Sequence, residues 1–125
     1  MIQFYQRWVV WYARVRYWVL INILRPYRFT SGFESFEVFD DHYTRHGREH
    51  PSFGKSVFSY ARFADTFCGG PKQVHILQHT RQSDGATVRC DPHSKIVGIH
   101  HANDFIGTCH VRSNAMNWFK REQLR

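Results

Sequence analysis

Apolar residues in the middle of the chain recur at helical spacing. Phe33, Phe36 and Val38 or Phe39, with acidic residues between them, predict a short helix that ends at Gly47. A second helix begins after Ser56, a suitable N-cap, and ends at Gly69-Gly70-Pro71. Its apolar positions lie three or four residues apart: Val57, Tyr60, Ala61, Ala64 and Phe67 or Cys68.

The pattern changes after Pro71 to short segments rich in β-branched residues. Four strands are predicted, at residues 74–79, 87–90, 96–101 and 105–112, separated by turn sequences such as Ser83-Asp84-Gly85. The tail, residues 114–125, is typical of a final helical turn, with Trp118 and Phe119 docked on the sheet. We therefore expect an α+β fold, in which N-terminal helices precede a four-stranded antiparallel β-meander with a short C-terminal helical turn.

The first 28 residues differ from the rest, since they mix aromatic, aliphatic and arginine residues densely. Arg16 and Arg25 enclose an uncharged run of only eight residues, too short to cross a bilayer, and no small-residue cleavage site follows it. An amphipathic helix would place Gln3, Arg7, Arg14 and Arg25 on one stripe.

Several roles are open for this amphipathic segment. The helix could lie in a membrane interface, giving peripheral membrane contact through residues 1–28, or it could pack on the rest of the protein or on a partner domain. A strand pair is a further alternative. With a linker expected near Thr30-Ser31-Gly32, the chain divides into an N-terminal segment, residues 1–29, and a domain, residues 33–125.

Net charge indicates which classes of partner the chain could bind, and cysteine content indicates in which cellular compartment it acts. Seventeen Lys and Arg against ten Asp and Glu give a net charge of +7, which predicts contact with a phosphate backbone, an anionic membrane or an acidic protein. Cys68, Cys90 and Cys109 form an odd set, which favours reduced thiols and a cytoplasmic site of action. A pairing of Cys90 with Cys109 across strands is the alternative.

Nine histidines favour acid–base chemistry or metal ligation, because histidine titrates near neutral pH. Cleavage of RNA without a metal needs a base, an acid and cations that stabilise the charge on phosphate. His42 and His46 would share one helix face, Arg89 lies in the middle of a strand, and Thr108 offers a hydroxyl. Further residues are predicted to hold the RNA: Arg81, Lys95, His110, Arg112 and Lys120.

Three other interpretations compete with a nuclease. A metal could bind His42, His46 and His50, or Cys90 and His93 with Cys109-His110, although neither set has a standard zinc spacing. The chain could bind RNA or anionic lipid without catalysis, its aromatic residues stacking on bases. It could also be a small membrane-peripheral protein whose first helix is the functional part.

An ordered set of motifs resembles bacterial polymorphic-toxin nuclease domains of the barnase/EndoU/colicin-like group of metal-independent ribonucleases. Residues 42–49 resemble the family's "HFxKHGxEF" opening, and residues 60–67 resemble the helix that follows. Residues 80–92 are similar to its "TRxxGxxVRYDP" hairpin, residues 96–99 to "FGVV", and residues 104–123 to "GxIRTYFKP" and "NxxYFxxQ". The resemblance covers about residues 40–123.

The resemblance implies a toxin that cleaves RNA, often tRNA, without a cofactor, and that an immunity protein counters. It further implies that the domain is delivered as part of a larger secreted toxin system. His42 or His46 would be the catalytic histidine, with Arg89 and Thr108 completing the site. Gly107 stands where the family usually has arginine, and His110 or Arg112 is the expected substitute.

Overall fold

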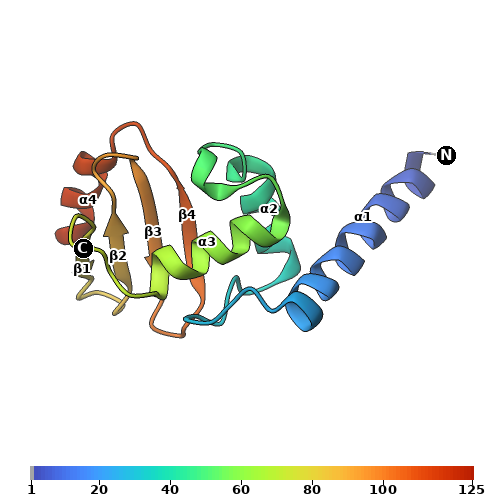
Figure 1. Ribbon diagram of the computed structural model, residues 1–125, viewed down its shortest axis with the longest axis horizontal. Helices are drawn as coiled ribbons and strands as arrows, with labels where there is room; N and C mark the ends of the chain where they lie inside the picture. Colours follow the sequence, from blue (N-terminus) through green and yellow to red (C-terminus); the bar gives the residue numbers. More distant parts are fainter. Residues whose placement is uncertain (1) are drawn as a thin grey trace.

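A computed structural model describes the backbone of residues 2–125 and the side chains of residues 6–125. The helices and strands follow one another in the expected order, with α-helices first, then strands, then a C-terminal helix (Figure 1). Their bounds are α1 Ile2–Val19, with a π-helical turn Leu20–Leu24, α2 Phe36–His46, a 3₁₀ turn Pro51–Phe53, α3 Val57–Gly69, β1 Leu77–Thr80, β2 Thr87–Cys90, β3 Ile96–His100, β4 Ile106–Val111 and α4 Ala115–Gln123.

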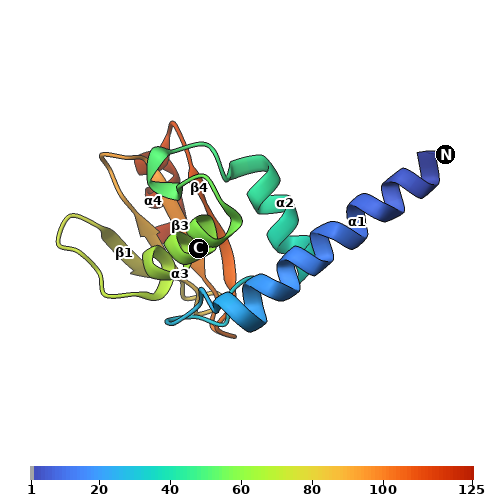
Figure 2. The same cartoon turned by 45° about the vertical axis from the view of Figure 1, so that its right-hand side comes forward.

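The four strands form one antiparallel sheet in the order β1-β2-β3-β4, so the predicted α+β fold with a β-meander is confirmed. Helix α3 lies across one face and α4 packs on the other, over β1 and β2 (Figures 1 and 2). Val88 and Val97 contact Trp118 and Phe119 of α4, as the pattern of the tail predicts. The expected helical turn is a nine-residue helix.

Helix α3 organises the larger of the two apolar clusters. Ser56 forms a capping box with Ser59, and Tyr60 and Cys68 are buried against the sheet. The Tyr60 hydroxyl donates a 2.6 Å hydrogen bond to the carbonyl of Cys109 in β4. A Cβ atom at Gly98 of β3 would lie 2.7 Å from the Cys68 sulfur, so only glycine lets the helix approach the sheet this closely.

Helix α1 is a helix throughout its described length, which excludes the alternative of a strand pair. Its C-terminal part packs on α2, where Tyr17 contacts Phe36 and Phe39 and Leu20 is fully buried. The rest extends away from the domain (Figure 2). Among the described residues, no helix is both long enough and apolar enough to cross a membrane.

The segment between α1 and α2 is fixed by one buried carboxylate. Asp65 of α3 accepts hydrogen bonds from the backbone amides of Arg28, Phe29 and Thr30 and from the Thr30 hydroxyl. Asp65 is fully buried and Thr30 is nearly so. The residues expected to form a linker therefore pack against α3.

The first strand begins later than the sequence pattern predicts. Val74, expected within the strand, is 98% exposed, and residues 73–76 form a turn closed by a bond from the Ile76 amide to the Gln73 carbonyl. Lys72 Nζ also donates to the Ile76 carbonyl. Strand pairing starts only at Leu77, opposite Cys90. Because β2 ends at Cys90, it offers no residue to pair with the turn before Leu77.

Replacing Asp65 tests its role in fixing the N-terminal segment. Asp65→Ala leaves three backbone amides and one hydroxyl without their buried acceptor, so we expect the free energy of unfolding to fall by about 3–5 kcal/mol. Urea denaturation measures this change, with Asp40→Asn on the exposed side of α2 as the control. A loss as small as that of the control would contradict the role given to Asp65.

Candidate active site

His46 lies in the last turn of α2 and is held there by a carboxylate. Its Nδ1 donates to Glu49 Oε1 at 2.7 Å, and the same oxygen accepts the backbone amide of Val111 in β4 at 3.2 Å. Because a carboxylate only accepts, the hydrogen of neutral His46 is on Nδ1 and Nε2 is free to accept a proton. Glu49 therefore orients His46 and ties the end of α2 to β4.

His110 lies on β4 directly beside His46. The two imidazole rings are stacked, with centroids 4.7 Å apart and planes inclined by 26°. Thr108 is two residues earlier on the same strand face, and its Oγ1 is 2.6 Å from His110 Nδ1. A hydroxyl can donate to Nδ1 or accept from it, so His110 can change tautomer without losing this contact.

The surroundings of His110 keep its imidazole neutral. Burial lowers the pKa of His110 to about 4, and the positive charges of His46 and Arg112 lower it further in the same direction. At neutral pH His110 is therefore unprotonated, and one of its ring nitrogens carries a free lone pair. Two stacked imidazoles also repel each other when both are protonated, so the pair favours one proton over two.

His42 lies one helical turn before His46 and at the border of the pair. Its Nδ1 donates to the carbonyl of Val38 at 2.9 Å, and its ring contacts Phe33. The centroids of the His42 and His46 rings are 6.1 Å apart, so the predicted shared face of α2 is confirmed. His46 contacts β4 through His110 and Glu49, whereas His42 faces the aromatic core.

Arg89 does not join His46 and Thr108, although the sequence places all three in one site. In the sheet Arg89 pairs with Gly98, which pairs with Cys109, so Arg89 projects from the α3 face. Thr108 alternates with Cys109 and projects from the opposite face. Arg89 Nη1 donates to the carbonyls of Phe67 and Gly70 at 3.0 and 2.7 Å, where it caps the end of α3.

The residues predicted to hold RNA are not all available at the histidine pair. Arg81 is buried, with ion pairs to Asp84 and Glu122 at 2.7 and 2.9 Å, which leaves it unavailable to a polyanion. Arg112 follows His110 by two residues, and its amide donates to the carbonyl of Lys95. The Arg112 guanidinium lies over the Trp118 ring of α4 and its Nε donates to Asn114 Oδ1, although its charge still acts on His110. Lys95 is exposed in the turn before β3. Lys120 is on the exposed side of α4.

The alternatives of a metal site and a disulfide find no support in the side-chain positions. No group of three His, Cys, Asp or Glu residues in the described part of the chain could hold a metal ion. Cys90 and Cys109 are separated by β3 and project from opposite faces, so they cannot pair. His50 instead accepts the amide of Ser52 in the turn after α2.

The sequence analysis missed two features of the site, namely the bond from His46 to Glu49 and the stacking of His110 on His46. Glu49 follows His46 by three residues within the motif, a signal that could have marked it as the partner of that histidine. His110 was expected to bind RNA, but its ring is half of the imidazole pair. At Gly107, a Cβ atom would lie 2.5 Å from His101 Nε2, so the His101 ring occupies the space that an arginine there would need.

Comparison with models of known protein families gives no match for the chain, and comparison with curated protein sequences gives none either. The likeness to polymorphic-toxin nucleases therefore rests on the motifs, and it stays a prediction.

The depressed pKa of His110 predicts a specific loss of stability in acid. The folded pKa of about 4 lies below the ordinary 6.5, so the unfolded chain binds more protons between these values. The contribution of His110 to the free energy of unfolding is thus fully present above pH 6.5, and it is lost as the pH is lowered from 6.5 to about 4. Allowing for partial exposure of the ring, we expect a contribution of about 1–2 kcal/mol.

Urea denaturation of the parent and of His110→Gln at a series of pH values measures this contribution. The stability of the parent should fall more steeply than that of the variant across the window. Parallel profiles would mean that His110 titrates normally in the folded protein.

Proposed function

We propose that this chain is a metal-independent endoribonuclease, in which His110 and His46 act as base and acid. The observation that carries the proposal is the stacked pair itself, with Glu49 on one imidazole and Thr108 on the other. Carboxylate and hydroxyl partners on Nδ1 leave both Nε2 atoms available for proton transfer. Such paired groups with different environments are the usual arrangement for acid–base catalysis near neutral pH.

The reaction needs only the groups of this cluster. Neutral His110 takes the proton of a ribose 2′-hydroxyl, whose oxygen attacks the adjacent phosphorus. The bond from phosphorus to the 5′ oxygen breaks, and protonated His46 gives its proton to that oxygen. The products are a 2′,3′-cyclic phosphate and a 5′-hydroxyl, and the two histidines have exchanged protonation states. Arg112, whose positive charge acts on His110, is the cation that we assign to stabilising the phosphate charge.

The net charge of +7 supports a polyanionic substrate. The motif resemblance extends the proposal to a toxin domain that acts in the cytoplasm and is neutralised by an immunity protein. An acidic partner that covers His46, His110 and Arg112 would block access to the histidine pair, which is how such a protein would inhibit the reaction. A decayed nuclease that only binds RNA is the alternative.

Cleavage of total bacterial RNA in EDTA tests the proposal. The parent should produce discrete fragments ending in 2′,3′-cyclic phosphate, and His46→Ala and His110→Ala should each reduce the rate by about 100-fold or more. His93→Ala, an exposed histidine of the β2–β3 turn, is the matched control and should cleave normally. If the folded parent leaves RNA intact, or if EDTA abolishes cleavage, the proposal is wrong.

Arg89→Gln distinguishes the present site from the one that the motifs imply. Because Arg89 is bonded to the end of α3, we expect the variant to lose stability while the folded fraction cleaves RNA at close to the parental rate. Thermal unfolding and cleavage rates measured below the unfolding transition separate the two effects. If Arg89→Gln is as stable as the parent but no longer cleaves RNA, Arg89 belongs to the catalytic site.

A further inference from the structure

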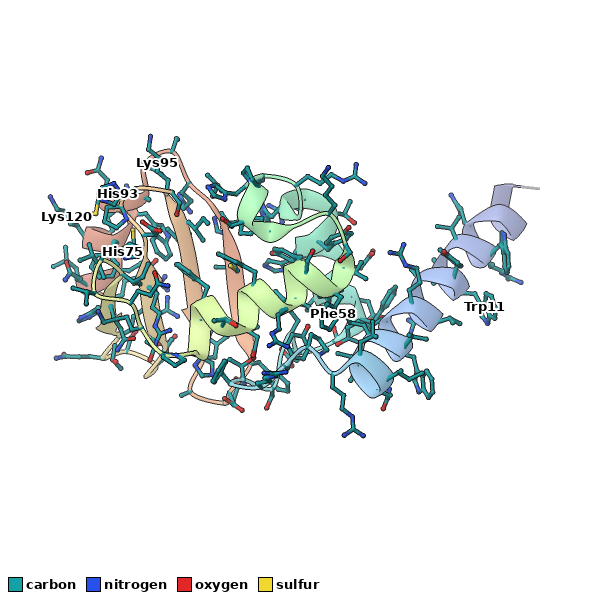
Figure 3. The ribbon with its side chains drawn as sticks, in the orientation of Figure 1. Trp11, Phe58, His75, His93, Lys95 and Lys120 are labelled. Atoms are coloured by element: carbon teal, nitrogen blue, oxygen red, sulfur yellow. The ribbon has the colours of Figure 1, made fainter. Side chains whose placement is uncertain are left out.

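The outward side of α1 carries a continuous apolar stripe. Successive residues of a helix are rotated by about 100°, so Trp8, Trp11, Val15 and Trp18 fall on one side. Their side chains are 56%, 55%, 40% and 58% exposed. The opposite side of the same helix, with Tyr17 and Leu20, packs on α2. The stripe therefore faces away from the domain, as the outward Trp11 illustrates in Figure 3.

Arginines flank this stripe. By the same helical rotation, Arg7 lies along one edge, and Arg14 lies on the same side, where its guanidinium pairs with Glu37 of α2 at 2.6 Å. Arg16 lies beyond the other edge, with its guanidinium over the exposed Tyr12 ring. No acidic residue precedes Glu34 in the chain. An indole-rich stripe flanked by Arg7 on one side and Arg16 on the other matches the boundary of an anionic lipid layer, where indoles sit at headgroup depth and arginines extend to phosphates.

We propose that α1 binds the surface of an anionic membrane, lying in the plane of the headgroups with its tryptophan stripe inserted. The helix does not have the length and apolarity to span the bilayer, which agrees with an in-plane position. A second copy of the helix fits the stripe less well, because pairing would bring the arginines of both copies together without acidic residues of α1 to offset them. This proposal is independent of the nuclease activity.

Vesicle binding by the full chain tests the proposal. Vesicles of phosphatidylcholine alone and of phosphatidylcholine with phosphatidylglycerol are the two probes, with flotation as the measure of binding. Tryptophan emission gives a second readout, because three of the four tryptophans are on α1 and the fourth, Trp118 of α4, is buried against the sheet. We expect flotation and a blue shift with the anionic vesicles, and much weaker binding to phosphatidylcholine.

Two sets of substitutions address the stripe and its edges separately. Trp8→Ser, Trp11→Ser and Trp18→Ser together should abolish flotation without lowering the unfolding temperature, since all three side chains are exposed. Arg7→Glu with Arg16→Glu should weaken binding roughly 20-fold or more. Lys120→Glu with Arg121→Glu changes the net charge equally from the exposed side of α4 and should leave flotation intact.

Three results would overturn the proposal. The first is a parent that does not float with anionic vesicles. The second is loss of flotation in the α4 charge variant as well, which would assign binding to the charge of the whole domain. The third is flotation that survives the triple tryptophan substitution. If the parent is a dimer that does not bind vesicles, and the triple tryptophan substitution dissociates it, the stripe is instead a contact between two copies of the chain.

Discussion

The buried Asp65 carboxylate is the interaction on which the arrangement of the helices depends. By accepting three consecutive backbone amides, it brings residues 28–30 against α3, and the chain then continues along the start of β4. There the Ser31 amide donates to the Asp104 carbonyl and the Ile106 amide donates to the Gly32 carbonyl. This path sets the position at which α2 begins beside β4, and so it determines which strand the end of α2 can reach.

Glu49 completes that placement at the other end of α2. One oxygen atom joins His46 to the backbone of β4, so the helix and the strand that supply the two imidazoles cannot separate without breaking both bonds. The proximity lowers the pKa of His110, with burial as the largest cause. Structural attachment and acid–base character therefore have a common origin in the packing of α2 on β4.

The two proposed surfaces lie at opposite ends of α2. Its N-terminal half contacts α1 through Phe36 and Phe39, and its last turn carries His46. A membrane-bound α1 would hold the domain at the lipid surface through the half of α2 that is remote from His46. The histidine pair would remain open to an RNA strand, since α1 extends away from the sheet that carries His110 (Figure 1).

The sequence by itself determined most of the elements from α2 onward and the antiparallel order of the strands, whereas it left the first 28 residues open between a helix and a strand pair. Periodicity, the Ser56 cap and the glycine and proline stops are local signals, which is why α2, α3 and three of the four strands could be predicted closely. The later start of β1 was decided by pairing, because Val74 has a strand-forming side chain but no partner strand.

The candidate site likewise depends partly on local spacing and partly on tertiary structure. His42 and His46 share a helix face by spacing alone, whereas the stacking of His46 on His110 joins residues 64 positions apart. Arg89 is assigned to the far face by the register of β2, β3 and β4, and register depends on how every strand packs rather than on any one segment.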